Sequence, residues 1–335
     1  MCKRIMAAQT NTEGGVPFYK IGTIGGKADA YISKDLFDEY KMKYSFPHKG
    51  EVMITCAGTV GKCIIYNGED SYYQDSNIVW IDNPNEIISN DFLYHLLSKI
   101  NWSHLNSTTI VRIYNDDLRN LKLYYPHHDE QKKITHLFQL INERIATQNK
   151  IIDKLQSLIK GIAQKIVHNN KPNVRLAECL ECKSSTLQES EVCEQGTYPV
   201  YGANGIVGYL DNYSTEGEAV YIIKDGSGVG TVSYVTGKCS ATGTLNILQA
   251  KEGYSLQYFY YLLKVLNFEP YKTGMAIPHI YFKDYGKAKV FCPSYTEQLQ
   301  YARLLSAIDN KLSAEQHILT NLSSQKQYLL RQMFI

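Results

Sequence analysis

The chain has 335 residues, of which 44% are hydrophobic and 20% are charged. This composition is typical of a globular protein with two or three domains and excludes a disordered chain. The formal net charge of +2 excludes a DNA binder held by bulk positive charge, but it allows a locally basic surface. No stretch approaches the ~18 apolar residues of a membrane helix, and the first ten residues become polar too early for a signal peptide. We therefore expect a cytoplasmic protein with no membrane partner.

The first half of the sequence predicts a strand-rich domain followed by one long helix. Runs of β-branched and aromatic residues at 52–55 and 62–66, divided by glycine-containing turns, are typical of strands. After Pro126, a nearly unbroken run of helix-forming residues ends at Pro172. The prediction is a first domain and a first spacer helix, over residues 1–128 and 129–171.

The second half repeats this order. Strands are predicted at 219–223 and 231–235, and neither glycine nor proline follows Pro293 before the end of the sequence. Ser294 and Glu297 have the spacing of a capping box, which marks the start of a helix. The prediction is a second domain and a second spacer helix, over residues 172–294 and 295–335.

The two halves are copies of one unit. Residues 113–131 align without a gap onto residues 280–298, and seven of the 19 pairs are identical, where chance would give roughly one. Residues 16–22 align onto residues 198–204 at a larger offset, so the first copy carries about 15 extra residues around 27–49. We therefore predict a pseudo-twofold α+β protein whose copies share a frame and differ in their loops.

Each long helix carries an apolar seam at heptad spacing, interrupted by Gln148 in the first helix and by Glu315 and Lys326 in the second, where the heptad pattern is weaker. At about 38 residues each, the helices are roughly 57 Å long. We predict that they pair as an antiparallel coiled coil; the alternative is that each packs on its own domain. The residues expected at the interface are Phe138, Ile141, Ile145, Ile152, Leu155, Ile159, Leu305, Ile308, Leu312, Leu319 and Leu322.

Motifs for catalysis are incomplete. Residues 57–63 resemble the end of a phosphate loop, but its first glycine would fall at Cys56 and its magnesium-binding hydroxyl at Cys63. Residues 225–230 resemble a dinucleotide loop, yet a predicted strand follows where that loop needs a helix, which favours a hairpin turn. We expect no catalytic residue and no cofactor in this chain.

The eight cysteines are scattered and predict reduced thiols rather than a disulfide framework. Cys179 and Cys182, together with Cys193, have part of the spacing of a zinc site. No fourth ligand follows nearby, so small buried thiols are the favoured interpretation and no metal is expected.

Two domains that each close in Pro-x-x-x-Glu-Gln and continue into a long heptad helix resemble the specificity subunit of type I restriction-modification systems. The motif stands at residues 126–131 and 293–298, and the resemblance covers essentially the whole chain. Residues 174–182 match the usual start of a domain in that family, whereas the first domain begins almost at Val16. The resemblance therefore predicts a first domain shortened at its start by about ten residues.

The resemblance also implies a function. In that family two target recognition domains each read one half of a split DNA sequence, and the helices between them dock adenine methyltransferase subunits. It implies a bacterial or archaeal, non-catalytic DNA-binding subunit. The implied partners are double-stranded DNA, two methyltransferase subunits and the restriction/translocase subunits. S-adenosylmethionine, ATP and magnesium are expected on those partner subunits.

A surface that reads DNA needs lysine or arginine for phosphates and polar side chains for base edges. Such residues gather in the sequence at the glycine hairpins and before the repeated segment. The alternative for each is an ordinary solvated loop residue or, for a tyrosine, a core residue. The predicted DNA-contacting residues are Lys20, Lys27, Lys62, Thr109 and Arg112 in the first copy, and Tyr201, Asn204, Lys224, Ser227, Lys272, His279 and Tyr281 in the second.

Two alternative functions stay open at this point. One is the recognition subunit of a related split type II restriction enzyme, which differs in whether its partner is a lone methyltransferase or a nuclease fused to one. The other is a coiled-coil interaction protein that does not bind DNA, for which any DNA association would be independent of sequence and insensitive to salt.

Overall fold

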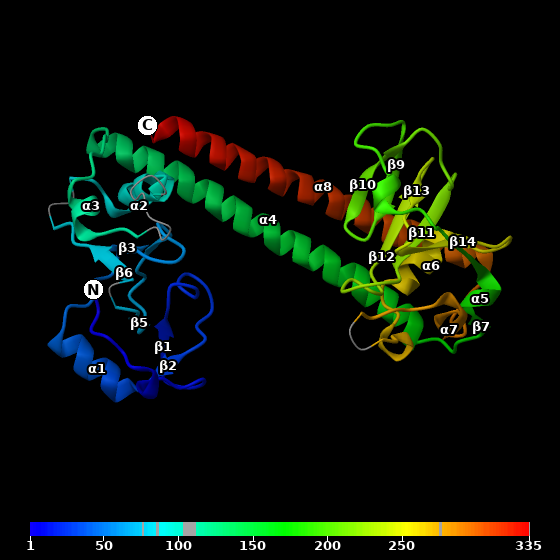
Figure 1. Ribbon diagram of the computed structural model, residues 1–335, viewed down its shortest axis with the longest axis horizontal. Helices are drawn as coiled ribbons and strands as arrows, with labels where there is room; N and C mark the ends of the chain where they lie inside the picture. Colours follow the sequence, from blue (N-terminus) through cyan, green and yellow to red (C-terminus); the bar gives the residue numbers. More distant parts are fainter. Residues whose placement is uncertain (76, 85–86, 103–111, 275–276, 335) are drawn as a thin grey trace. The chain divides into compact units, whose positions relative to one another are not determined.

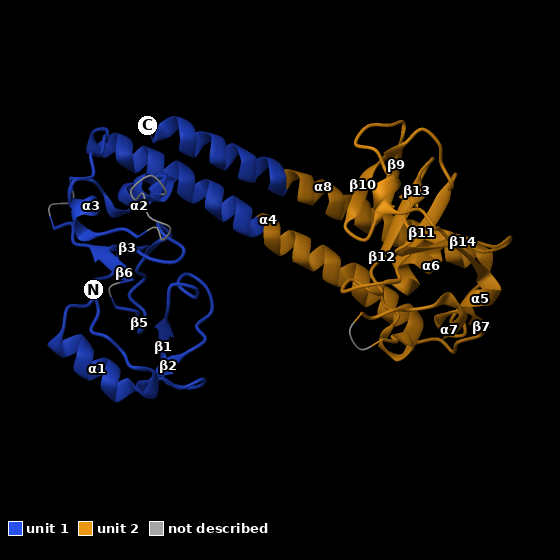
Figure 2. Ribbon diagram, viewed as in Figure 1, with its two compact units in different colours: residues 1–147, 319–335 blue, residues 148–318 orange. Residues whose placement is uncertain are grey.

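The computed structural model describes residues 1–75, 77–84, 87–102, 112–274 and 277–334 (Figure 1). Contacts divide the chain into unit 1, residues 1–147 with 319–335, and unit 2, residues 148–318 (Figure 2). The division falls inside two long helices, α4 (His128–His168) and α8 (Tyr295–Met333), so each unit contains part of both. None of the helices in the described part of the chain has the length and apolar character needed to cross a membrane.

Unit 1 contains two three-stranded sheets. β1 pairs antiparallel with β2 and parallel with β5, and β3 lies between β4 and β6, antiparallel to both. Its strands are β1 (Val16–Tyr19), β2 (Tyr31–Ile32), β3 (Val52–Thr55), β4 (Cys63–Ile65), β5 (Tyr72–Tyr73) and β6 (Ile78–Ile81). Besides α4 and α8, its helices are η1 (Ala7–Gln9), α1 (Lys34–Lys43), α2 (Asn90–Lys99) and α3 (Asn115–Arg119).

Unit 2 has the same plan with additional strands. β9 pairs antiparallel with β10 and parallel with β13, while the larger sheet has the order β12-β11-β14-β8 and β15 pairs with β7. The strands are β7 (Val174–Arg175), β8 (Leu180–Ser184), β9 (Tyr198–Gly202), β10 (Gly205–Leu210), β11 (Glu218–Ile223), β12 (Val232–Thr236), β13 (Ser240–Ala241), β14 (Leu245–Ala250) and β15 (Lys289–Val290). The helices are α5 (Leu176–Cys179), η3 (Glu189–Glu191), α6 (Leu256–Leu263), η4 (Glu269–Tyr271) and α7 (Phe282–Tyr285).

The predicted internal repeat and fold class are confirmed by the strand pairing. The sheet β2-β1-β5 has the strand order and directions of β10-β9-β13, and β4-β3-β6 matches β12-β11-β14. The correspondence extends to irregular segments, because η1 matches η3 and the bridge between Asn11 and Tyr31 matches that between Cys193 and Tyr209. Residues 1–15 therefore correspond to residues 183–197.

The two units differ at one edge and in one insertion. In unit 2, β8 pairs with the outer edge of β14, whereas among the described residues of unit 1 β6 pairs only with β3. The extra residues of the first copy form α1, which begins after the capping hydroxyl of Ser33 and buries Phe37 completely. Phe37 packs there against Tyr72, in the apolar core next to the β2-β1-β5 sheet.

The glutamine of each Pro-x-x-x-Glu-Gln motif joins a long helix to its domain. Gln131 is fully buried; its side-chain oxygen accepts from the Ser89 amide, and its side-chain nitrogen donates to the Pro126 carbonyl. Gln298 makes the same pair of bonds with the Ser255 amide and the Pro293 carbonyl. Because Ser89 and Ser255 cap α2 and α6, each glutamine ties the start of a long helix to the start of a domain helix.

α4 and α8 pair with each other within both units, which confirms the predicted pairing. In unit 1 the buried rings of Phe138 and Phe334, the residue directly after α8, lie 5.6 Å apart, and Leu329, Leu330 and Met333 of α8 pack against the same apolar cluster. In unit 2 the side-chain amide of Gln148 donates to the main-chain carbonyl (3.0 Å) and to the carboxylate of Glu315. Gln148 and Glu315, each of which interrupts an apolar seam, thus contact each other. All eleven residues predicted at the interface are buried or half-buried.

Candidate nucleic-acid interface

Three predicted lysines of unit 1 belong to two loops that contact each other. Lys20 and Lys27 lie in the loop between β1 and β2, and Lys62 precedes β4 in the β3–β4 hairpin. The Lys62 ammonium donates to the Ile24 carbonyl at 2.5 Å, which joins the hairpin to the loop. Gly61 has φ +82° and faces the Trp102 ring, so only glycine fits at this turn. The result is a cluster of three exposed or half-exposed cations.

The other two residues of unit 1 that were predicted to contact DNA stand just before the repeated segment 113–131. Arg112 is half-buried, with its guanidinium 5.8 Å from the centre of the Tyr114 ring. Burial raises the pKa of the Cys56 thiol to about 11, and the nearby charge of Arg112 acts in the opposite direction. Thr109 lies outside the described residues.

In unit 2 two of the predicted residues meet around a carboxylate. Nδ1 of His279 lies 2.6 Å from Oδ1 of Asp225, and the Lys224 ammonium lies 3.8 Å from Oδ2. Main-chain contacts hold this arrangement, since Asp225 and His279 form a bridge and the Gly226 amide donates to the Pro278 carbonyl. Because Nδ1 faces the carboxylate, the other ring nitrogen of His279 is directed away from it.

The remaining predictions of unit 2 lie in different surroundings. Ser227 is exposed at the turn between β11 and β12, and Asn204 is exposed at the turn between β9 and β10. The Lys272 ammonium lies 2.6 Å from the Glu269 carboxylate. Tyr281 is 46% exposed, whereas Tyr201 packs edge-on against Tyr221 in the core of its unit.

The same main-chain hydrogen bond places the two hairpins in both copies. The Ile113 amide donates to the Cys56 carbonyl at 2.9 Å, and the Ile280 amide donates to the Lys224 carbonyl at 2.9 Å. Each bond holds the residue before it, Arg112 or His279, beside the hairpin that follows β3 or β11. The repeat therefore presents one surface twice, built on one frame with different side chains.

Sequence reasoning missed the acidic partners of the lysines and of His279. Asp29 pairs with Lys20 at 3.1 Å, and Glu269 and Asp225 hold Lys272 and His279. The only available signal was local, because Asp225 directly follows Lys224 in an Asp-Gly turn. These carboxylates orient the cations, and they also lower the net positive charge of each surface.

The cysteines form no cluster with metal-ligand geometry in the described part of the chain, and no group of three or more histidine, cysteine or acidic side chains there is placed to hold an ion. All eight cysteines are free thiols. Burial raises the pKa of Cys179 to about 12, with the neighbouring Cys292 adding to the shift, so this thiol stays protonated at neutral pH.

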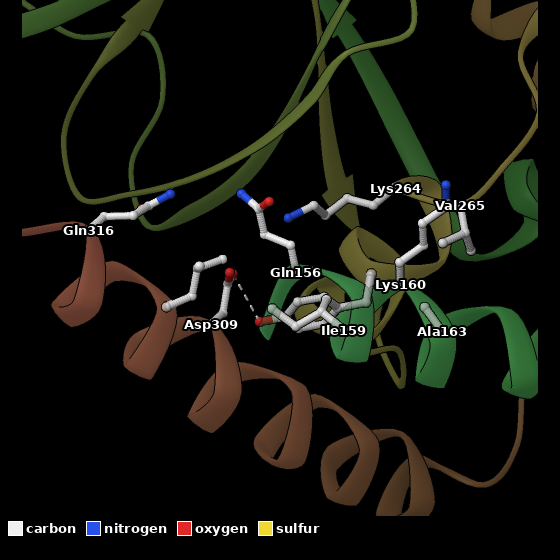
Figure 3. A pocket seen from close by; sticks show the side chains of 10 residues that line it. Gln156, Ile159, Lys160, Ala163, Lys264, Val265, Asp309 and Gln316 are labelled. Atoms are coloured by element: carbon white, nitrogen blue, oxygen red, sulfur yellow. Dashed lines mark hydrogen bonds between the residues drawn. The ribbon is translucent and has the colours of Figure 1, made fainter. Parts of the chain in front are cut away.

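Unit 2 also contains a hollow of about 430 Å³ between α4, α6 and α8 (Figure 3). In this hollow Asp309 of α8 accepts a hydrogen bond from the Tyr261 hydroxyl of α6 at 3.3 Å, and Figure 3 shows Lys160 of α4 pointing toward Val265. None of the predicted DNA-contacting residues lines this hollow. Its lining combines two lysines, two glutamines, one tyrosine and one carboxylate with apolar side chains.

This repeated frame defines a protein with two DNA-specificity domains. The sequence matches the type I restriction modification DNA specificity domain over residues 1–157 and 170–324, and the chain belongs to that family.

Two curated relatives are similar. A putative type I restriction enzyme specificity subunit of Haemophilus influenzae is 45% identical over 164 residues, which is 49% of this chain and 39% of that protein. The specificity subunit of the Escherichia coli type I enzyme EcoprrI is 28% identical over 116 residues, which is 35% of this chain and 29% of that protein. The chain thus matches well under half the length of these relatives.

Two solved structures share the fold over nearly the whole chain. A type I restriction-modification S subunit from M. genitalium superposes with a TM-score of 0.66 at 19% identity, covering 100% of this chain and 92% of that one. A chain from a structure described in terms of complex assembly and conformational transition of the type I system has a TM-score of 0.57 at 15% identity. That match covers 96% of this chain and 91% of the other.

Proposed function

We propose that this chain is the DNA-reading and assembly subunit of a type I restriction-modification complex. The observation that carries the proposal is the hydrogen bond repeated at Ile113 and Ile280, which places two equivalent hairpin surfaces with different side chains. One frame with two sets of reading residues suits a target made of two unlike half-sites. The function places the chain in the cytoplasm, where bacterial and archaeal DNA lies.

The long helices supply a surface for partner subunits. Their paired faces are buried, and both helices also carry exposed apolar side chains that a partner subunit would cover on docking. We propose that two methyltransferase subunits dock here and that the restriction subunits join the complex through them. The exposed residues are Leu137, Leu140 and Leu158 on α4 and Leu304 and Ile318 on α8.

The chain itself does no chemistry in this proposal. The partner subunits bind S-adenosylmethionine for methylation and ATP with magnesium for cleavage. The phosphate-loop-like residues 57–63 form a β3–β4 hairpin rather than a loop that opens a helix, which supports the proposal. Purified chain without partners should neither cut nor methylate DNA, and turnover by such a preparation would contradict the proposal.

The decisive experiment exchanges one recognition domain. Residues 174–292 are replaced by the equivalent segment of another family member, and each chain is co-expressed with its methyltransferase subunits. Adenine methylation is then mapped across the host genome. We expect one half of the bipartite target to change and the other to stay. A change in both halves, or in neither, would refute the modular function, and a chain carrying synonymous codon changes alone controls for expression.

A further inference from the structure

The main chain of unit 2 holds His279 from both sides. The His279 amide donates to the Thr273 carbonyl at 2.7 Å, and the His279 carbonyl accepts from the Thr273 amide at 2.9 Å. On its other side His279 forms a bridge with Asp225. Beside that bridge, the Ile280 amide donates to the Lys224 carbonyl at 2.9 Å. The backbone therefore places Asp225 and His279 opposite each other, whatever bond their side chains form.

The imidazole ring of His279 is also fixed on two of its sides. Nδ1 lies 2.6 Å from Oδ1 of Asp225. On the Cδ2 side the ring borders the turn at Gly274, which has φ +87°, and a Cβ added to that glycine would lie 3.2 Å from Cδ2. The side chain is still 35% exposed. The ring therefore presents its remaining edge, which carries Nε2.

The carboxylate of Asp225 decides which ring nitrogen carries the proton. An ionised carboxylate only accepts hydrogen bonds, so Nδ1 of His279 donates to it. In the neutral imidazole the other nitrogen, Nε2, then has a lone pair and accepts. The Lys224 ammonium lies 3.8 Å from the second oxygen of the same carboxylate. A cation therefore already faces Asp225, and the ring need not be charged to stay in place.

Unit 1 builds the same position from different chemistry. The bond from the Ile113 amide to the Cys56 carbonyl matches the bond from Ile280 to Lys224. It puts Arg112 in the place of His279, and Ala57, which follows Cys56, in the place of Asp225. A guanidinium only donates hydrogen bonds and suits the two acceptors of guanine. The equivalent position is thus a donor in one copy and an acceptor in the other.

We propose that His279 reads a base that offers an exocyclic amine, and that Asp225 is the positioning residue that keeps Nε2 an acceptor. In the major groove the amino groups of adenine and cytosine donate, whereas the oxygens of guanine and thymine accept and would face the lone pair of Nε2. The inference rests on the proposed function. It adds the base chemistry of one contact and a recognition role for Asp225.

The first test moves the ring proton and keeps the shape of the site. In Asp225→Asn the side-chain amide can donate to Nδ1, which leaves the proton on Nε2 and makes it a donor. Each chain is co-expressed with its methyltransferase subunits, and adenine methylation is mapped across the host genome. In the half-site that depends on residues 174–292, one position should lose its preference for adenine or cytosine by about threefold to tenfold. The other half-site should stay unchanged.

Glu269→Gln is the matched control. The Glu269 carboxylate lies 2.6 Å from the Lys272 ammonium, so this variant removes the same charge from unit 2 without touching His279. It should leave the base preference at every position as in the parent. Asp225→Asn methylation with the parent's preference would overturn the proposal. Equal weakening on all sequences would do so too, because it would indicate that His279 contacts phosphate.

The second test removes the amine from the DNA. Duplexes carry, one position at a time, an analogue of adenine or cytosine that lacks the exocyclic amine, and binding by the purified complex of the full chain with its methyltransferase subunits is measured. At one position the loss should weaken parent binding by about threefold to tenfold, and His279→Ala should abolish that difference.

This measurement begins with the parent chain, so it does not depend on the folding of a variant. Parent binding that is indifferent to every amine of this half-site would overturn the proposal, as would amine losses that stay equally costly in His279→Ala. These results would leave the proposed function standing. A parent complex that methylates no bipartite target would refute the proposed function, and this inference with it.

Discussion

The contact between Gln148 and Glu315 offers a direct test of how the long helices choose their alignment. Gln148 is 2% exposed and Glu315 6%, and the amide donates to the carbonyl and carboxylate of Glu315. The Lys311 ammonium lies 2.5 Å from the same carboxylate. The two residues stand 167 positions apart, which is the offset of the internal repeat, so they are equivalent positions that meet each other.

Single substitutions should cost more than the double substitution. Gln148→Leu leaves the buried carboxylate without its amide donor and should cost about 2–3 kcal/mol of stability. Glu315→Leu keeps the main-chain carbonyl as an acceptor for Gln148, so its cost should be smaller, about 1 kcal/mol. The double variant removes this polar pair from the seam and should be about as stable as the parent or more stable, which gives a coupling of roughly 3–4 kcal/mol.

Native-state hydrogen exchange of the α4 amides from residue 148 onward is the suitable assay, because a chain with two units need not unfold in one step. Leu155→Ala, in the same seam, serves as an apolar control that should show no coupling to Glu315→Leu. Additive losses in the double variant, within about 0.5 kcal/mol, would show that the two side chains do not stabilise each other and would refute the reasoning.

Four further results are expected. Burial lowers the pKa of His95 from 6.5 to about 4, so as the pH falls this imidazole is protonated in the unfolded chain before it is protonated in the folded one. Unit 1 should therefore lose up to about 3 kcal/mol of stability between pH 6.5 and pH 4. A His95→Phe chain should lose less stability over that range. Gln298→Ala leaves a buried amide and carbonyl without partners and should cost about 2–3 kcal/mol, read as faster hydrogen exchange in α6; unchanged exchange would contradict it. Lys27→Ala should weaken specific and non-specific DNA binding alike and reduce the salt dependence of binding by about one ion, whereas a selective loss at one base pair would show base contact instead. Limited proteolysis should cleave unit 1 before unit 2, because its β6 edge is uncovered in the described structure; first cuts confined to residues 172–292 would contradict this.

The sequence predicts those features of this fold that depend on local periodicity. The strand at 52–55 and the long helices follow from side-chain spacing, and the repeat follows from aligned identities, so these predictions are confirmed. α1 in the extra residues of the first copy was not predicted, although Leu36, Phe37 and Tyr40 have the spacing of one helix face.

Contacts between residues far apart in the chain could not be predicted from the sequence. Gln148 and Glu315 were each visible as a break in an apolar seam, but heptad spacing does not fix which turn of one helix faces which turn of the other. The pairing of Asp225 with His279 depends on a bridge between segments 54 residues apart. Of the residues predicted to contact DNA, Lys20, Lys27 and Lys62 lie on neighbouring loops, whereas Tyr201 packs against the core and Thr109 lies outside the described residues. Contact of any of them with DNA stays a prediction.

The two motif glutamines have a consequence for how such proteins change over evolution. Gln131 forms hydrogen bonds with the Ser89 amide and the Pro126 carbonyl, and Gln298 with the Ser255 amide and the Pro293 carbonyl. All four partner atoms belong to the main chain. Hydrogen bonds to the main chain do not depend on the identity of most side chains in the attached domain. A domain exchanged between two such joints can therefore keep this attachment even when its side chains differ.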